Sequence, residues 1–346
     1  MNDGQRINLI SDTVTKPTPG MLQFMFQAPV GDDVFREDPS VIQLETKLAD
    51  LFQQEAGLFC PSGTMANQIA IKGHTSPLDE MICEWSSHVF QYEVSGYGFH
   101  SGIAVNPIQT AQGKLDPALI ESLIKANQDW LPNTRLVVLE NTGNRTGGNY
   151  YTLEEMSTIS ELCRTKNLKL HLDGARIFNA IIAGGYSPDT IGPLFDSITI
   201  CMSKGLGAPV GSVLLGPLDW IQRCRKIRKV MGGGMRQAGY LAAAGIYALD
   251  HHVDRLAIDH DHARQIESSL SRLDYVDSIK KVQTNIIIFD LKQSLSTSSF
   301  LNQLSEYGIH ASAFGKQSIR FVTHLDINSE MVQKVIHVLK EKIKIS

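Results

Sequence analysis

The chain contains the stretch Ile198-Thr-Ile-Cys-Met-Ser-Lys-Gly-Leu-Gly-Ala-Pro209, in which an apolar run leads directly into a lysine followed by glycines. The apolar run is typical of a buried β-strand, and the glycines predict that the chain turns there. Lys204 therefore stands where a strand delivers its last residues into a cleft. A lysine partly removed from water loses its proton more readily, and its free amine then adds to an aldehyde. Alone, Ser203-Lys204-Gly205 would more often be a surface loop, so the interpretation depends on the other segments.

Two further apolar runs end on groups that complete this chemistry. Leu168-Lys-Leu-His-Leu-Asp173 ends on an aspartate, and Gly57-Leu-Phe-Cys-Pro-Ser-Gly-Thr64 ends on a small-residue turn that opens a helix. A carboxylate such as Asp173 keeps a pyridine nitrogen protonated, and backbone N–H groups at a helix N-terminus bind phosphate. Each feature has a plainer reading, because Asp173 could cap the next helix and Ser-Gly-Thr could be an ordinary helix start. Together, the lysine, the aspartate and the turn predict an enzyme that uses pyridoxal 5′-phosphate (PLP).

Three more residues are candidates for contacts with the cofactor or substrate. Arg176 follows Asp173 by three positions, and its planar guanidinium suits a ring oxygen of the cofactor or a substrate carboxylate. His88 is a candidate ring to stack on the cofactor, although a loop histidine is the plainer reading. Arg320 is a charge inside an apolar run, where a substrate carboxylate or a structural ion pair would balance it.

Composition limits the classes of protein that fit. With 346 residues, the chain is long enough for one large domain and a smaller one. The net charge of −4 gives no general attraction to nucleic acid or to an anionic membrane, and no apolar run approaches the ~20 residues that span a bilayer. The five cysteines form no Cys-x-x-Cys pair, and the first residues do not resemble a secretory signal. We therefore expect reduced thiols and a cytoplasmic location.

The order of elements predicts an α/β fold. Strands alternating with helices are typical of a mostly parallel sheet, and the predicted strands are 136–140, 168–173, 197–202 and 211–216. Beyond about residue 250 the pattern changes to a helix over 250–272, then two strands interleaved with helices, which predicts a small α+β domain. We expect a large PLP-binding domain over 1–249 and a small domain over 250–346, with the boundary inside a continuous helix.

Three other patterns do not indicate a metal site, a nucleic-acid-binding surface or a dinucleotide-binding turn. Histidines and aspartates over 251–262 contain metal-ligand residue types but lack a tight ligand spacing, which predicts a solvated polar helix face and no metal site. The basic run Arg223–Lys229 has no interleaved aromatic residues, so a helix face or an anion contact fits better than nucleic acid. The glycines at 205–207 and 232–234 do not form the Gly-x-Gly-x-x-Gly pattern of a dinucleotide-binding turn.

Together, these segments resemble the L-threonine aldolase family, in the β-eliminating lyase group of fold-type I PLP enzymes. The matching stretches follow the family's order over essentially the whole chain: Ser11-Asp-Thr-Val-Thr-Lys-Pro17, Gly31-Asp-Asp-Val34, Glu37-Asp-Pro39, Pro61-Ser-Gly-Thr64, Glu140-Asn-Thr142, His171-Leu-Asp-Gly-Ala-Arg-Ile-Phe-Asn-Ala180, Ser203-Lys-Gly-Leu-Gly207, Gly232-Gly-Gly-Met-Arg-Gln237 and Val322-Thr-His-Leu-Asp326. The resemblance implies PLP fold type I and retro-aldol cleavage of L-threonine, L-allo-threonine and related β-hydroxy-α-amino acids to glycine and an aldehyde.

The resemblance also implies a role for individual residues. Lys204 would carry the cofactor, Asp173 would hold the pyridine nitrogen, and His88 would stack on the ring. Other groups are implied at the phosphate (Gly63, Thr64, Ser203), at the substrate carboxylate (Ser11, Arg176, Arg320) and at the cofactor across a subunit interface (Arg236, Lys229). The family builds its site between subunits of a homotetramer, and the N-terminal segment 1–15 would reach the active site.

The chain departs from the family pattern at two positions. Gly143 stands where many members have a histidine that meets the substrate's β-hydroxyl, and Phe35 stands where many have tyrosine. Both changes remove polar groups from the side expected to face the β-substituent. We therefore hypothesise that a water positioned by His88, or the cofactor phosphate, takes the hydroxyl proton. A second hypothesis is that Gly143 widens the pocket for bulkier substrates such as phenylserine.

Two alternative functions stay open from the sequence. A PLP-dependent β-eliminating lyase or an amino-acid racemase could use the same scaffold, because fold alone does not fix the reaction. A catalytically silent PLP-binding subunit is a remote alternative, because such a protein would not need Lys204, Asp173, Arg176 and Arg320 together.

Overall fold

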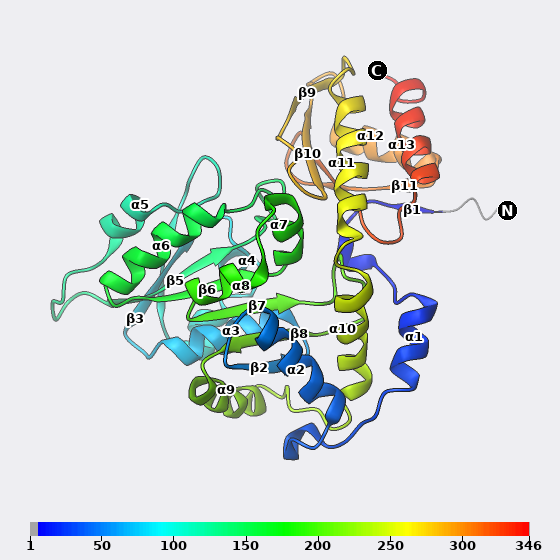
Figure 1. The fold of residues 1–346 in the computed structure, drawn as a ribbon. Helices are drawn as coiled ribbons and strands as arrows, with labels where there is room; N and C mark the ends of the chain where they lie inside the picture. The colour runs from blue at the N-terminus through cyan, green and yellow to red at the C-terminus, as the bar shows by residue number, and fades with distance from the viewer. Residues whose placement is uncertain (1–5, 346) are drawn as a thin grey trace.

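The computed structural model describes residues 6–345, and its centre is a seven-stranded β-sheet (Figure 1). Its strands, in spatial order, are β2 (Ala56–Cys60), β8 (Ser212–Gly216), β7 (Ser197–Cys201), β6 (Lys169–Gly174), β5 (Asn133–Glu140), β3 (Asp79–Glu84) and β4 (Ala104–Ile108). β8 runs antiparallel to both of its neighbours, and all other pairs are parallel. The predicted strands β5 to β8 are confirmed, whereas β3 and β4 were not predicted.

Helices cover both faces of this sheet, so its strands are apolar on both sides. In β5, Leu136 and Val138 pack into one core while Val137 and Leu139 pack into another. One face is covered by α3 (Gly63–His74) and α9 (Leu218–Val230). The core on the other face takes residues from α2 (Pro39–Leu51), α6 (Leu153–Thr165), α7 (Ile177–Gly184) and α10 (Gly239–His251).

The remaining elements of this part are short. They are α1 (Pro19–Phe26), α4 (His88–Gln91), α5 (Pro117–Leu123), α8 (Pro188–Ile191), the 3-10 turns η1 (Asp12–Val14), η2 (Asp33–Phe35) and η4 (Gly192–Leu194), and the π-helical turn η3 (Tyr97–Ser101). Asp38 caps α2 by accepting a hydrogen bond from the Val41 N–H, with Pro39 in the first turn as predicted.

The parallel register places the chemically important segments at one edge of the sheet. β2, β3, β5, β6 and β7 all run in the same direction, so their carboxyl ends lie together. Segments far apart in sequence, after Cys60, Asp173 and Cys201, therefore meet. In open α/β sheets, this edge is where ligands usually bind.

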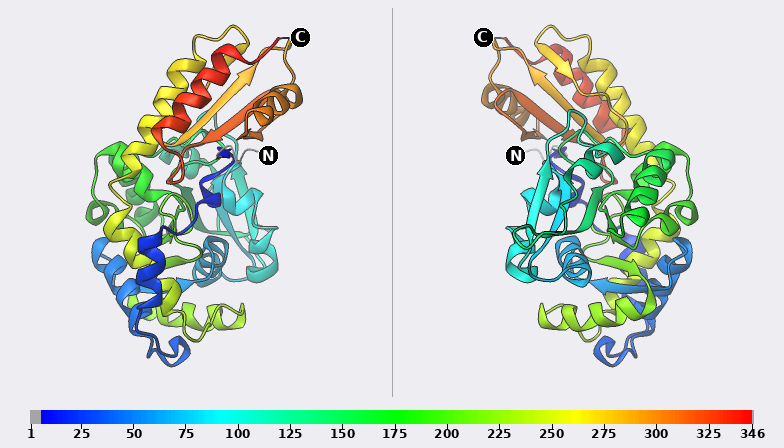
Figure 2. Two further views of the ribbon diagram at one scale, coloured as in Figure 1. Left: turned by 90° about the vertical axis from the view of Figure 1, so that its right-hand side faces the viewer. Right: turned by 90° about the vertical axis from the view of Figure 1, so that its left-hand side faces the viewer.

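The C-terminal part has its own sheet and core, and it lies to one side of the large sheet (Figure 2). It comprises α11 (Leu256–Leu270), β9 (Val276–Ile279), β10 (Ile286–Leu291), α12 (Thr297–Glu306), β11 (Ile309–His310), β12 (Ser312–Ala313), β13 (Ser318–Val322) and α13 (Ser329–Glu341). The order β12-β13-β10-β9 is antiparallel throughout. No helix within residues 6–345 is long and apolar enough to cross a membrane.

The junction between the two parts differs from the continuous helix that we predicted. α10 ends at His251 and α11 begins at Leu256, with a turn between them. The N-terminal segment also joins the C-terminal part, because β1 (Ile7–Asn8) pairs with β11 and both Ile7 and Leu9 enter the second core. The domain division at residues 249 and 250 stays a prediction.

The histidine-rich face of α11 is more buried than its sequence predicted, whereas the basic run makes an anion contact, one of the two outcomes predicted for it. On α11, Asp259, His260 and His262 are buried, so the expected solvated face is wrong at these positions. His260 Nε2 lies 2.9 Å from Asn179 Oδ1, so the polar ring faces a neighbouring helix rather than water. In the basic run of α9, Arg228 is buried and donates to Asp33 and to the Phe59 carbonyl, both at 2.6 Å.

Replacing Leu172 by alanine tests the packing of the central strand. Leu172 is fully buried in β6 between two other strands, and its removal leaves a cavity in the core. We expect Leu172→Ala to lower the free energy of unfolding by about 2–5 kcal/mol. Urea denaturation measures this, with the exposed Leu218→Ala as a control that should change the value by less than about 0.5 kcal/mol. Equal effects of the two substitutions would contradict the assigned core.

Candidate active site

A pocket of about 290 Å³ opens where the carboxyl ends of the strands meet. Six residues predicted from the sequence line it: Gly63, Thr64, His88, Asp173, Ser203 and Lys204. Thr13, Asn67, Ala175, Thr199, Cys201 and Pro209 line it as well. The structure therefore brings together the lysine, the carboxylate, the histidine ring and the helix N-terminus that were predicted from separate segments.

Local hydrogen bonds fix the segment that carries Lys204. β7 ends at Cys201, and Lys204 follows in a turn that Gly207 closes by donating its N–H to the Lys204 carbonyl at 2.8 Å. Gly207 has φ +78°, a conformation that favours glycine. The Thr15 hydroxyl also donates to the Lys204 carbonyl, at 2.9 Å. The N-terminal segment thus holds the lysine backbone from a position 189 residues away in the sequence.

Asp173 is buried and held at both carboxylate oxygens. Its Oδ2 accepts from Asn67 Nδ2 at 2.9 Å, and its Oδ1 accepts from the Ala175 N–H at 3.1 Å. These two hydrogen bonds fix the orientation of the carboxylate. A negative charge at the base of the pocket is the group that a protonated pyridine nitrogen needs.

His88 is oriented by two carboxylates. Its backbone N–H donates to Glu140 at 2.5 Å, and its ring Nδ1 lies 2.9 Å from the buried carboxylate of Glu93. Burial lowers the pKa of His88, but the hydrogen bond to Glu93 and the charge of Asp173 outweigh it, so the pKa is raised. For Glu140, burial and the neighbouring charge of Asp173 raise the pKa to about 6.

Asn67 connects the carboxylates of Asp173 and Glu93, and its other side begins a chain of buried polar groups. Its Nδ2 donates to Asp173 and to Glu93, each at 2.9 Å, so its Oδ1 faces His171 Nε2 at 3.3 Å and accepts a hydrogen bond from it. His171 Nδ1 must then accept from the Ser197 hydroxyl at 2.8 Å. Ser197 in turn accepts from His74 Nε2 at 2.8 Å. The two carboxylates therefore set the direction of every hydrogen bond in the chain, which we call the Asn67–His74 chain.

His88, Glu93 and Asp173 also place one possible metal ligand each within 4.8 Å of one another. The Asn67 amide donates a hydrogen bond to Glu93 and another to Asp173, so its N–H groups lie between the two carboxylates. This geometry accounts for the cluster without a cation, in line with our expectation of no metal, which stays a prediction.

Arg176 does not line the pocket as a free guanidinium. It is buried and makes a two-pronged ion pair with Asp12, from Nε at 2.7 Å and from Nη2 at 2.6 Å. Burial raises the pKa of Asp12, but the charge and hydrogen bond of Arg176 outweigh it and bring the pKa to about 2. Nη1 is the part of Arg176 that this ion pair leaves available for another anion.

Arg320 lies near Arg176 but outside the lined pocket. It donates from Nη1 to Asn144 Oδ1 at 3.1 Å and from Nη2 to the Ile10 carbonyl at 3.0 Å. Burial and the charge of Arg176 lower its pKa, and no carboxylate within residues 6–345 forms an ion pair with it. Ser11 caps η1 by accepting from the Thr13 N–H at 3.3 Å, and Thr13 itself lines the pocket.

The other predicted residues lie outside the pocket of the single chain. Phe35 is 69% exposed and Arg236 reaches over its ring at 6.0 Å, while Lys229 is exposed on α9. Gly143 lies beside the side chains of Thr146 and Asn149, and a Cβ built there would collide with both. Any side chain at this position would therefore require Thr146 and Asn149 to move.

Sequence reasoning missed several residues that shape the site. Asn67 and Glu93 carry no motif of their own, and their contact with Asp173 and His88 appears only when α3 packs on the sheet. Asp12 lies within the quoted Ser11–Pro17 stretch, but nothing in that stretch marks it as the partner of Arg176. Residues 1–5, part of the predicted N-terminal contribution, lie outside the described residues.

The pocket fits PLP by its donor set. Lys204 supplies an amine, Asp173 a fixed carboxylate, and Ser62 caps α3 so that the N–H groups of Gly63 and Thr64 stand at the start of a 12-residue helix. The Thr199 hydroxyl lines the same pocket and is buried without a hydrogen-bond partner among the described residues. A polar ligand would satisfy this group.

The fold and the site define a PLP-dependent enzyme of fold type I. Among solved structures, the chain is similar to a threonine aldolase from Leishmania major, with a TM-score of 0.83 and 21% identity over 96% of this chain and 98% of that one. It is also similar to a putative L-allo-threonine aldolase from Listeria monocytogenes, with a TM-score of 0.81 and 21% identity over 97% of this chain and 96% of that one. The TM-scores of these two matches show that the fold is shared.

Sequence comparison gives the family. The model of the β-eliminating lyase family matches residues 8–294, and the chain belongs to this family. The low specificity L-threonine aldolase of Escherichia coli K12 is 40% identical over 332 residues, covering 95% of this chain and 97% of that protein. A probable low-specificity L-threonine aldolase 2 of Arabidopsis thaliana is 37% identical over 337 residues, covering 95% of each.

Replacing Glu93 by glutamine tests what orients His88. The raised pKa means that the folded protein holds the His88 proton more tightly than the unfolded chain, whose value is 6.5. This contribution to stability is complete below pH 6.5 and is lost as pH rises through the folded pKa. We expect Glu93→Gln to lower the pKa of His88 in an NMR titration, with the exposed His337 unchanged as the internal control. An unchanged His88 titration would show that Glu93 does not set it.

Proposed function

We propose that this chain is a PLP-dependent aldolase that cleaves L-threonine, L-allo-threonine and related β-hydroxy-α-amino acids to glycine and an aldehyde. The observation that carries the proposal is the single pocket in which Lys204, Asp173 and His88 meet. The names of the relatives from Escherichia coli and Arabidopsis thaliana support threonine as a substrate. A β-eliminating lyase or a racemase has no such support from these relatives.

Each residue of the pocket has a task in this reaction. Bound PLP supplies an aldehyde for an amine and a ring that accepts the electrons of the broken Cα–Cβ bond. Lys204 would be the amine that holds the cofactor. Asp173, fixed by Asn67 and Ala175, keeps the ring nitrogen protonated, and Gly63, Thr64 and Ser203 hold the phosphate.

The substrate carboxylate is assigned to the two arginines. Arg320 is incompletely neutralised, and Arg176 keeps Nη1 outside its ion pair with Asp12. Holding the carboxylate would fix rotation about the substrate's bond to nitrogen and so select which bond at Cα breaks. Ser11 would join them from the N-terminal segment.

The β-hydroxyl proton must leave as the aldehyde forms, and His88 is our candidate for positioning the water that takes it. Glu93 occupies its Nδ1, which leaves Nε2 as the free ring nitrogen. Because the pKa of His88 is raised, the basic form of the ring becomes dominant only at higher pH. The cofactor phosphate is the alternative base.

The proposal extends to assembly and location. We propose a homotetramer in the cytoplasm, with Arg236 and Lys229 reaching a neighbouring active site. Both residues lie beside strongly exposed apolar side chains, Phe35 at 69% and Val230 at 89% exposure, which are suited to burial in an interface.

A product assay tests the proposed reaction. The purified PLP-loaded protein is incubated with L-threonine, L-allo-threonine and L-phenylserine, and glycine and aldehyde are measured together. We expect equimolar products, and no turnover from Lys204→Ala. Pyruvate with ammonia, or a racemised amino acid, in place of glycine would reject the aldolase in favour of a lyase or a racemase.

The same assay tests the effect of Gly143 on substrate choice. The filled space around Gly143 gives no added room there, so a preference for phenylserine would have to come from elsewhere in the site. The widening hypothesis predicts a higher kcat/KM for phenylserine than for threonine. It fails if threonine is the better or an equal substrate.

Replacing His88 by phenylalanine separates stacking from proton transfer. Phenylalanine keeps an aromatic ring over the cofactor but removes both nitrogens. If His88 positions the catalytic water, kcat should fall by roughly 10²-fold or more, with little change in PLP affinity. An unchanged kcat would assign the proton to the cofactor phosphate.

A further inference from the structure

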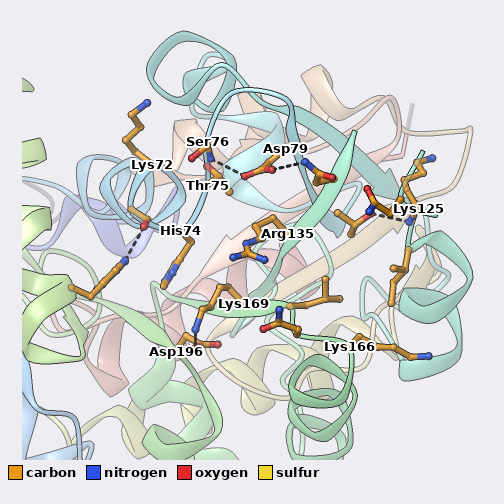
Figure 3. A pocket seen from close by; sticks show the side chains of 18 of the residues that line it. Lys72, His74, Thr75, Ser76, Asp79, Lys125, Arg135, Lys166, Lys169 and Asp196 are labelled. Carbon is orange, nitrogen blue, oxygen red and sulfur yellow. Dashed lines mark hydrogen bonds and ion pairs between the residues drawn. The ribbon is translucent and has the colours of Figure 1, made fainter. Parts of the chain in front are cut away.

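A cavity of about 1030 Å³ lies at the opposite edge of the large sheet, near the amino ends of the parallel strands (Figure 3). The first residues of β3, β5 and β6, which are Asp79, Asn133 and Lys169, line it together with the end of α3. The cavity shares no lining residue with the pocket that contains Lys204. Nothing in the proposed reaction uses it.

The lining of this cavity is strongly basic although the whole chain is acidic. Two acidic residues, Asp79 and Asp196, face six basic ones: Lys72, Lys125, Arg135, Lys166, Lys169 and Arg223. The two acids are already engaged, because Asp196 pairs with Lys169 at 2.7 Å and Asp79 accepts from the Ser76 N–H at 2.8 Å.

Four of the basic residues lack an acidic partner. Lys166 pairs with Glu121 at 2.6 Å, but Lys72, Lys125, Arg135 and Arg223 have no carboxylate within 4.0 Å in the part of the chain that the structure describes. Like charges gathered in one concave site without counter-charges attract an anion. The cavity therefore offers both the charge and the room for one.

The inner wall is fixed by an aromatic pair. The His74 ring stacks on Trp220 with centroids 4.3 Å apart and an angle of 15°, and both residues line the cavity. Burial and the charges of Lys169 and Arg223 lower the pKa of His74 to about 3, so its ring is neutral. The positive charge of the cavity therefore comes from its lysines and arginines. Figure 3 shows His74, Arg135, Lys169 and Asp196 around the middle of the cavity.

We infer that this cavity binds a small polyanion carrying two or more phosphate groups, and that the Asn67–His74 chain transmits its presence to Asp173. The cavity is far larger than one phosphate needs, and its four unpaired cations suit several negative charges. A concave site with converging side chains fits a small ligand better than nucleic acid, which needs an extended basic surface. This inference goes beyond the proposed reaction and does not depend on which substrate is cleaved.

The Asn67–His74 chain supplies the route between the two sites. An anion beside His74 polarises the neutral ring, whose Nε2–H then donates more strongly to Ser197. Hydrogen bonds in such a chain strengthen one another through His171 and Asn67. The last link is the hydrogen bond from Asn67 to Asp173, the carboxylate that would face the cofactor nitrogen. We therefore expect the ligand to activate the enzyme.

Calorimetry of the PLP-loaded protein tests binding, with pyrophosphate as the probe at constant ionic strength. We expect saturable binding of one pyrophosphate per chain, accompanied by a change in the fluorescence of Trp220. Arg135→Gln should weaken binding by about tenfold or more, because a charge-assisted contact is lost. Arg135 is exposed and has no ion-pair partner among the described residues, so the Arg135→Gln protein should fold. Lys72→Gln, at another residue that lines the cavity, gives a second test.

The matched control is Lys334→Gln, which removes the same charge from an exposed site on α13 and should bind as the wild type does. The inference is overturned if binding does not saturate, if potassium chloride reproduces the signal, or if Arg135→Gln binds pyrophosphate as tightly as wild type. Release of PLP during the titration would place the probe in the cofactor pocket and would also overturn it.

Transmission is tested in the same protein. Bound pyrophosphate should raise kcat/KM by about fivefold or more and shift the absorbance of the bound cofactor. Ser197→Ala removes the central hydroxyl of the chain while leaving the basic residues in place. We expect this variant to bind pyrophosphate, with its affinity reduced only by the coupling that is lost, but without the cofactor shift. Binding to wild type with no effect on absorbance or turnover would overturn the transmission, as would a full response in Ser197→Ala.

Discussion

The amide of Asn67 is the interaction on which the site depends. One NH2 group donates to two buried carboxylates, so it holds Asp173 against the cofactor nitrogen's expected position and Glu93 against His88. Two like charges so close together would repel each other without this shared donor. A carboxylic acid in place of the amide would add a third negative charge, and a hydroxyl could donate only one hydrogen. The asparagine therefore couples the position of the Asp173 carboxylate to that of the His88 ring.

The N-terminal segment ties the two parts of the chain to this site. Ile7 and Leu9 pack into the second core, Thr15 holds the backbone of Lys204, and Asp12 between them neutralises buried Arg176. An unpaired guanidinium at that depth would be costly, so the Asp12 ion pair is what allows Arg176 to lie there. The same pair limits Arg176, because two of its donors are no longer free for a substrate. In the proposed reaction, Arg320 would therefore bind the substrate carboxylate more than Arg176 would.

The sequence predicted the features whose causes are local. The apolar runs predicted β5 to β8. Lys204, Asp173 and Gly63 each follow such a run, and they meet in one pocket because the carboxyl ends of parallel strands share an edge. Partners across the fold were not predictable, since nothing near Asn67 or Glu93 in sequence marks them as neighbours of Asp173. Burial was misjudged on α11 for the same reason: His260 looks like a surface histidine until Asn179 is seen opposite it. β3 and β4 were missed because their runs are short and carry charged or proline residues.

Alternation along β6 explains why the two edges of the sheet are connected. Its leucines turn to one core, and Lys169, His171 and Asp173 therefore share the other face, which α3 covers. Lys169 stands at the basic cavity, Asp173 at the cofactor pocket, and His171 lies between them. Such a polar layer contributes little net stability, because its desolvation offsets its hydrogen bonds, and apolar side chains of similar size would pack there equally well. What the layer adds is a directed path of hydrogen bonds through an otherwise apolar sheet. Stability alone therefore does not account for it, whereas the communication between the two edges that we infer would.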